Sequence, residues 1–109
     1  MITDDLEIYR GDAFSRTYRI LDDDTPRDLT GYAIAAQIRV TPNTDTAVSF
    51  TIDMTAAASG EVTISLLPNQ TADLPQRSVW DLQLTSATNA DDVETLVAGD
   101  VSLVLDVTR

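Results

Sequence analysis

Apolar and polar residues alternate with a period of two along most of this chain, and no window shows the apolar spacing of three to four residues that an amphipathic helix needs. The segment 32–40 shows the alternation most clearly. One side of it carries Tyr32, Ile34, Ala36, Ile38 and Val40, and the other carries Ala33, Ala35, Gln37 and Arg39. Successive side chains of a strand point to opposite faces, so the first set belongs to a core and the second to a mildly polar outer face. The chain is therefore predicted to be mostly β-strand.

Further alternating runs follow the same pattern and are separated by clusters of Gly, Pro, Asn and Asp. They begin with a short run at Leu6 and Ile8 and continue over residues 14–20, 48–54, 62–66, 78–85 and 93–107. Residues 41–45 break the pattern as a turn. Residues 48–54 and 62–66 are predicted to form an antiparallel hairpin, and a bulge or bend is expected at Gly99. The stretch 68–75 is the only helix-like piece, because Pro68 suits a first helical position and Pro75 ends it after a turn or two.

About seven or eight short strands in a chain of 109 residues are typical of two packed sheets. We predict an all-β, Ig-like antiparallel β-sandwich with one short helical turn, forming a single domain over residues 1–109. The last residues still alternate, so the chain is expected to end at the border of its fold. No cysteine is present to link the sheets, and the core is expected to form around the aromatic side chains of Trp80, Phe14, Phe50, Tyr18 and Tyr32.

The charge of the chain restricts its partners. It has 18 acidic residues and 7 arginines, no lysine, and a net charge of -11. Such a surface repels phosphate backbones and anionic lipid headgroups, so neither nucleic acid nor a membrane is expected as a partner. No apolar run approaches the roughly 18 to 20 residues of a membrane-spanning helix, and the acidic N-terminus differs from the basic start of a secretory signal.

The sequence offers no catalytic constellation, and we expect no enzyme and no cofactor. It lacks histidine and cysteine, which removes imidazole acid–base chemistry and thiolate nucleophiles. Its glycines stand singly in turns and form no nucleophile elbow or phosphate loop. The run Asp22–Asp24 could offer carboxylates to a calcium ion, but a solvated hairpin turn explains three aspartates equally well. Carboxylates occur in every loop, so none of them is singled out as an acid–base pair.

A series of segments in a fixed order gives the chain a family resemblance. They are Arg10–Phe14, Leu21–Tyr32, Ala36–Arg39, Gly60–Leu66, Thr71–Pro75 and Trp80–Leu84. Together they resemble small bacteriophage virion proteins with an Ig-like sandwich, in particular the N-terminal domain of baseplate upper proteins and related short tail proteins. The resemblance implies a structural protein of the virion, in the tail or baseplate, that contacts other phage structural proteins and occurs as a homo-oligomer or in repeated copies. In such baseplate proteins the domain anchors a following fibre or receptor-binding module. Nothing follows Arg109, so a self-contained subunit is expected instead.

Assembly needs a contact surface, and the predicted outer faces suggest one. The expected interface residues are Tyr9, Ala33, Ala35, Arg39, Val79 and Val97, with Val79 and Val97 taken to point outward. The alternative is that loops merely cover both sheet faces. Two other functions also remain open, a capsid decoration protein on the virion head and a carbohydrate- or calcium-binding module.

Overall fold

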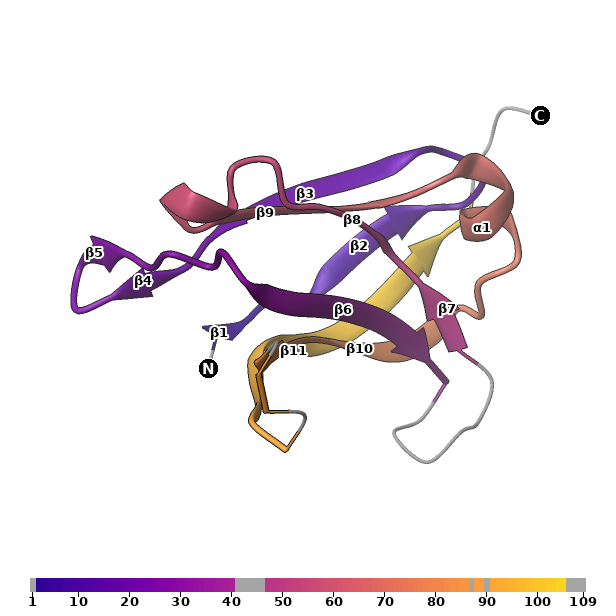
Figure 1. Ribbon diagram of the computed structural model, residues 1–109. Helices are drawn as coiled ribbons and strands as arrows, with labels where there is room; N and C mark the ends of the chain where they lie inside the picture. The colour runs from indigo at the N-terminus through magenta and orange to yellow at the C-terminus, as the bar shows by residue number, and fades with distance from the viewer. Residues whose placement is uncertain (1, 41–46, 87, 90, 106–109) are drawn as a thin grey trace.

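Two β-sheets stacked face to face form the protein, as the computed structural model shows (Figure 1). The structure describes residues 2–40, 47–86, 88–89 and 91–105. Sheet A, the lower layer in Figure 1, contains β1 (Ile2–Thr3), β2 (Leu6–Tyr9), β6 (Tyr32–Arg39), β7 (Ala47–Ser49), β10 (Arg77–Ser86) and β11 (Val93–Val104). Sheet B contains β3 (Phe14–Arg19), β8 (Thr51–Asp53) and β9 (Glu61–Leu66).

The remaining elements are short connections. A projecting hairpin is formed by β4 (Leu21–Asp22) and β5 (Thr25–Pro26) at one end of the molecule (Figure 1). The 3-10 helix η1 (Ala57–Ser59) leads into β9, and α1 (Pro68–Ala72) crosses from β9 in sheet B to β10 in sheet A. The single helical turn predicted over 68–75 is confirmed, with Pro68 at its first position.

The strand order is β1/β2–β11–β10–β6–β7 in sheet A and β3–β9–β8 in sheet B. The pairs are antiparallel apart from β1 and β2, which run parallel to β11. The predicted all-β sandwich is therefore confirmed, with one parallel edge that alternation alone does not reveal. The two ends of the described chain meet at this edge, where Leu6 lies opposite Val101.

The run predicted over 48–54 serves both sheets. Its first part is β7, which pairs with β6, and its second part is β8, which pairs with β9 as the predicted hairpin requires. The exchange falls at Phe50, whose backbone N–H still donates to the carbonyl oxygen of Ala36 at 2.9 Å. Phe50 is only 5% exposed because its ring fills the space between the layers. The expected turn over 41–45 and the strand end near Val107 lie outside the described residues.

The bulge expected at Gly99 lies three residues earlier. The register between β10 and β11 shifts after Leu82, which is opposite Val97, while Gln83 is opposite Thr95. Leu96 is therefore the extra residue of β11, and both Leu96 and Val97 are buried. Gly99 continues the strand, and its role is to allow a close approach. A Cβ atom on Gly99 would lie 2.3 Å from the backbone oxygen of Asp4.

The aromatic core is largely as predicted. Trp80 is 3% exposed, and its ring centroid lies 5.8 Å from those of both Tyr18 and Phe50. Phe14 and Tyr32 are partly buried and pack against the border of this core. Large aromatic rings supply much of the apolar area that holds two sheets together without a covalent link.

Asp4 connects the N-terminal segment to both sheets. Its backbone oxygen accepts a hydrogen bond from Trp80 Nε1 at 2.9 Å, and its N–H donates to the Ala98 carbonyl at 3.0 Å. Its carboxylate accepts hydrogen bonds from Arg16 Nη1, at 2.9 Å, and from the Tyr18 hydroxyl, both on β3. Burial, together with the hydrogen bond to the negative carboxylate, raises the pKa of Tyr18 well above its ordinary range. These contacts fix the interrupted strand β1–β2 against sheet B.

A candidate protein-binding face on sheet A

The outward face of sheet A is the candidate site. Along β10 the odd-numbered residues point outward, because the alternating residues from Ser78 to Leu84 are buried. The strand registers place neighbours beside them in rows. Val79 lies between Arg39 and Asp100, Asp81 between Gln37 and Ala98, Gln83 beside Ala35, and Thr85 beside Ala33. On β2, Glu7 and Tyr9 continue the same face at the sheet edge, since Leu6 and Ile8 point into the core.

Five of the six predicted interface residues share this face. Ala33, Ala35 and Arg39 come from β6 and Val79 from β10, and the registers place them close together. Tyr9, half exposed at 51%, stands apart at the far edge on β2. The structure thus gathers residues separated by up to 70 positions in the chain onto one surface.

The prediction that Val97 points outward is wrong. Val97 is completely buried and faces sheet B, like Val101. A bulge at Gly99 would have reversed the alternation between Val97 and Val101. Because the extra residue is Leu96 instead, the alternation continues unbroken from Val97 to Val101.

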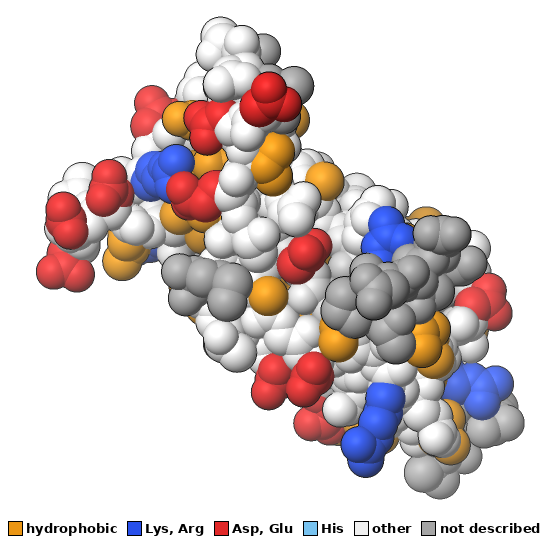
Figure 2. All heavy atoms as spheres, turned by 90° about the horizontal axis from the view of Figure 1, so that it is seen from below, with side chains coloured by type: hydrophobic (Ala, Val, Ile, Leu, Met, Phe, Trp, Pro, Cys, Tyr) orange, Lys and Arg blue, Asp and Glu red, His pale blue; other side chains and the backbone are white. Residues whose placement is uncertain are grey.

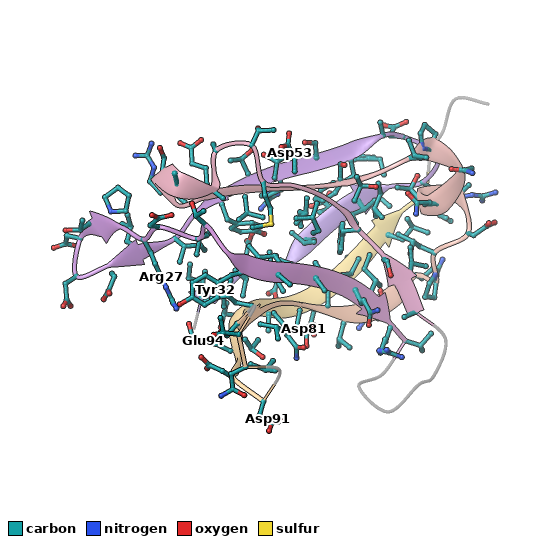
Figure 3. All side chains as sticks on the ribbon, viewed as in Figure 1. Arg27, Tyr32, Asp53, Asp81, Asp91 and Glu94 are labelled. Atoms are coloured by element: carbon teal, nitrogen blue, oxygen red, sulfur yellow. The ribbon has the colours of Figure 1, made fainter. Side chains whose placement is uncertain are left out.

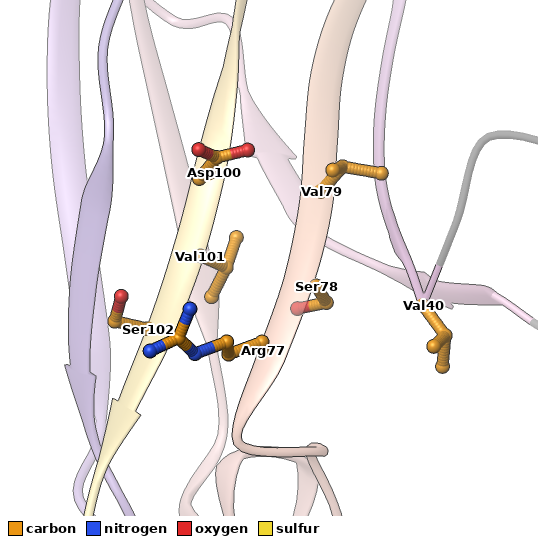
Figure 4. A pocket seen from close by; sticks show the side chains of 7 residues that line it. All are labelled: Val40, Arg77, Ser78, Val79, Asp100, Val101 and Ser102. Carbon is orange, nitrogen blue, oxygen red and sulfur yellow. The ribbon is translucent and has the colours of Figure 1, made fainter.

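The described residues of the face carry many short side chains and form no continuous apolar area. Figure 2 looks onto it and shows hydrophobic side chains in separate small patches between acidic and basic groups. Two shallow depressions lie side by side and share Val79 and Asp100. One, about 390 Å³, also touches Val40, Arg77, Ser78, Val101 and Ser102 (Figure 4). The other, about 360 Å³, extends toward Gln37, Arg39, Trp80, Asp81, Ala98 and Gly99.

Charges of both signs flank these depressions. Arg39 Nη2 donates to Gln37 Oε1 at 2.9 Å, which holds the guanidinium along the surface. Asp81 points away from the sandwich in Figure 3. Arg77 and Asp100 border the depression drawn in Figure 4. The described residues of this face mix short apolar, acidic and arginine side chains, and they form no basic patch of the kind that nucleic-acid binders use.

An ion pair at the opposite end of sheet A has a structural role. Arg27 Nη1 donates to Glu94 Oε2 at 2.9 Å, and its guanidinium carbon lies 5.7 Å from the centre of the Tyr32 ring (Figure 3). The hydrogen bond to Glu94 is the main reason that the pKa of Arg27 is raised. These contacts fasten the segment after the projecting hairpin to β11.

The acidic clusters form turns. Asp23 and Asp24 are the two central residues of the β4–β5 hairpin and have positive φ angles of 50° and 68°. This is the geometry of a type I′ turn, in which aspartate is common. Asp28 and Asp53 accept hydrogen bonds from Thr30 and Thr55, which lower their pKa values. Across residues 2–40, 47–86, 88–89 and 91–105, no three His, Cys, Asp or Glu residues are placed to hold a metal ion.

Sequence reasoning missed half of the candidate face. Its β10 residues could have been found, because the alternation of 77–86 assigns Asp81 and Gln83 to the outer side. The β11 residues Ala98 and Asp100 were missed because a bulge was expected at Gly99, between them, whereas the alternation runs unbroken from Val97 to Val101. Within the described part of the chain, no helix has the length and apolar character to span a membrane.

Two stacked sheets, a predominantly antiparallel strand order and an aromatic core define a β-sandwich domain. A family model described as "LtfC-like, beta-sandwich domain" matches residues 1–104. The chain belongs to this LtfC-like family.

One solved structure shares the fold, and a second is similar to the chain at a lower score. The N-terminal domain of phage TP901-1 ORF48 is 10% identical, with a TM-score of 0.53, and the match covers 93% of this chain and 83% of that one. The Listeria monocytogenes internalin-like protein lmo2027 is 13% identical, with a TM-score of 0.45, over 96% of this chain and 28% of that one. No curated protein sequence matches the chain.

These comparisons bear on the predictions made from the sequence. The predicted likeness to the N-terminal domain of a phage protein is confirmed for the fold. The family description mentions a β-sandwich and no reaction, so no catalytic family is indicated. Neither comparison favours capsid decoration.

Proposed function

We propose that this protein is a structural component of a bacteriophage tail or baseplate, which binds other virion proteins through the outward face of sheet A. The observation that carries the proposal is the fold, which the chain shares over 93% of its length with an N-terminal domain of a phage protein. The order of its sequence motifs, which resembles baseplate upper proteins, supports the same role.

The geometry of the face suits a contact with a folded protein. From Arg77 to Thr85 the face measures about 27 Å along β10, and the five strand positions of sheet A span about 19 Å, which gives an area of about 500 Å². A standard interface buries about 800 Å² on each partner. The face alone is smaller than one side of a standard interface, so neighbouring surface or a second contact must add to it in a stable assembly.

The small residues at the centre of the face allow close approach. Ala35 is exposed on β6 and lies beside Gln83, so a flat partner surface could reach the backbone of both strands. Arg39 and Asp100 flank Val79 and offer charged hydrogen bonds at the border of that contact. Short apolar residues surrounded by charged ones match the general anatomy of an interface.

Incorporation into virions tests the proposal. We would produce phage carrying the Ala35→Arg variant, which places a long charged side chain on the face, and Thr51→Arg as the matched control on the outer face of sheet B. The protein is expected in the tail fraction of dissociated virions, with Ala35→Arg lost from the particles and Thr51→Arg retained. Detection only in the head fraction, or equal incorporation of both variants, would contradict it.

A further inference from the structure

The outer edge of sheet B has unpaired backbone groups along the whole of β3. The N–H of Ile20 donates to the carbonyl of Gly60 at 2.7 Å, which extends the register in which Tyr18 is opposite Val62. Directly opposed residues of an antiparallel pair are hydrogen-bonded at every second position. The backbone groups of Phe14, Arg16 and Tyr18 therefore point toward β9. Those of Ser15, Thr17 and Arg19 point away from it, to the free side.

Nothing in the described part of the chain covers these groups. β3 has only β9 as a strand neighbour (Figure 1), and among the described residues no hydrogen bond reaches the outward backbone groups of Ser15, Thr17 or Arg19. The other sheet edges are less available. β7 has three residues, and Gln70 donates to the Ser49 carbonyl at 3.4 Å, while the edge strand β1–β2 is interrupted after Thr3. With six residues, β3 is the longest uninterrupted free edge among the described strands.

We infer that β3 pairs antiparallel with β3 of a second copy of this chain, about a twofold axis at Thr17. In this register Thr17 faces Thr17 of the second copy, and Ser15 faces Arg19. Arg16 faces Tyr18, and Phe14 faces Ile20, the residue just beyond the strand. The outward backbone groups at 15, 17 and 19 would form about six hydrogen bonds between the copies. The two three-stranded sheets would become one sheet of six strands.

The side chains of β3 suit pairing with a second copy. No two like charges are opposed in this register, because each arginine faces a hydroxyl-bearing residue. An inward-pointing charge on an edge strand can block pairing with another strand. The charge of Arg16 is neutralised by the Asp4 carboxylate, 2.9 Å from its Nη1 atom. The guanidinium carbon of Arg16 also lies 5.9 Å from the centre of the Phe14 ring. Arg19 is paired with Glu61 at 2.9 Å. The edge is therefore close to neutral, in a chain whose net charge is -11.

The outer face of sheet B adds a second argument. The cross-strand neighbours Ser15, Ser65 and Thr51 form one row. Thr17, Thr63 and Asp53 form the next, in which the Oγ1 atoms of Thr17 and Thr63 lie 2.8 Å apart. Pairing two β3 edges would continue this hydroxyl-bearing surface across the axis without burying an unpaired charge. The dimer would also carry two copies of the candidate face on sheet A, so that two weak contacts with an assembly act together.

A single engineered thiol tests the register directly, because the chain has no cysteine. Directly opposed Cα atoms lie about 4.5 to 5.5 Å apart in antiparallel sheets, within the roughly 4.4 to 6.8 Å that a disulfide spans. Under mild oxidation Thr17→Cys should form a covalent dimer at least about tenfold faster than Thr51→Cys, an exposed position on the same sheet. Equal cross-linking of the two variants would overturn the inference.

Solution mass gives the second test. The wild-type mass by light scattering should rise with concentration from 11.8 kDa toward twice that value, and more readily in added salt, which screens the repulsion between two acidic copies. Thr17→Lys opposes two like charges on the axis and should weaken the dimer by about tenfold, whereas Thr51→Lys should not. Circular dichroism would verify that both variants fold. A wild type that stays monomeric at every concentration, or two lysine variants that dimerise alike, would refute the pairing.

The inference is separate from the proposed function. Virion incorporation that depends on Ala35, in a protein that remains monomeric, would refute the β3 pairing and leave the proposed role intact. A dimer that fails to enter virions would refute the proposed role and leave the β3 pairing intact.

Discussion

The close contact between Gly99 and Asp4 predicts a large effect from the smallest substitution available there. In Gly99→Ala the added Cβ would lie 2.3 Å from the backbone oxygen of Asp4 and 2.7 Å from its carbonyl carbon. Real Cβ atoms do not approach other atoms below 3.0 Å, and both of these atoms belong to the backbone. The segment that contains Asp4 must therefore move away from β11.

The cost follows from the hydrogen bonds made by that segment. The Asp4 carbonyl accepts from Trp80 Nε1 at 2.9 Å, and the Asp4 N–H donates to Ala98 at 3.0 Å. Opening the contact from 2.3 Å to 3.0 Å stretches these bonds toward or beyond the useful limit of about 3.2 Å. Two lost bonds cost about 2 kcal/mol together, and overpacking adds about 1 to 3 kcal/mol. We expect Gly99→Ala to lower the free energy of unfolding by about 3 to 5 kcal/mol.

Urea unfolding followed by the fluorescence of Trp80, the only tryptophan, measures this loss. Gly31→Ala is the matched control, because Gly31 has a φ of 85° and no atom within 4 Å of an added Cβ. Gly31→Ala should lower the free energy of unfolding only by the cost of holding alanine in a left-handed backbone conformation, about 1 to 2 kcal/mol. A loss below about 1 kcal/mol in Gly99→Ala, or equal losses in both variants, would show that the N-terminal segment yields freely and that our reasoning about this contact is wrong.

Three further predictions concern the core and its polar groups. Trp80→Ala should cost about 3 to 5 kcal/mol by circular dichroism, because Trp80 is 3% exposed, and a cost under 1 kcal/mol would exclude it from the core. Ser78 is 4% exposed, and its hydroxyl has no hydrogen-bond partner in the described structure. In thermal unfolding, Ser78→Ala should therefore raise the free energy of unfolding by about 1 kcal/mol, and a clear decrease would indicate that the hydroxyl has a partner. The folded chain holds the Tyr18 proton more tightly than the unfolded chain, so the stability from this group is complete below pH 10 and falls as the pH rises further. Tyr18→Phe should remove this part of the alkaline decline in urea midpoints, and an unchanged decline would assign it to other groups.

Much of the fold could be predicted from local pattern. The alternation over 32–39 assigned the buried and exposed sides of β6 correctly, and Pro68 marked the start of α1. The assignment of Val40 to the core side is wrong, because Val40 lies just beyond the strand and is 51% exposed. The partition of 48–54 between two sheets could not be predicted, because both halves alternate in the same way and only the position of Phe50 between the layers separates them. The parallel pairing of β2 with β11 was equally hidden, since it joins residues about 95 positions apart.

The residues of the candidate face could also be predicted only in part. Ala33, Ala35, Arg39 and Val79 could be assigned to outer faces because each lies in an uninterrupted run. Val97 was assigned to the wrong face, because the bulge lies at Leu96 and the alternation from Val97 to Val101 is unbroken. A bulge is set by the fit between two strands in three dimensions, and a lone glycine nearby is a poor guide to its place.

The alternating order of residues by itself determined that this chain forms layered sheets, because each strand must bury one side of a pleat whose side-chain period is two. Only the tertiary structure decided which strands became neighbours, that Asp4 reaches both layers, and that β3 keeps an unpaired edge. Those outcomes depend on contacts between distant segments, whose energies are fixed by packing in space and leave no periodic trace along the chain.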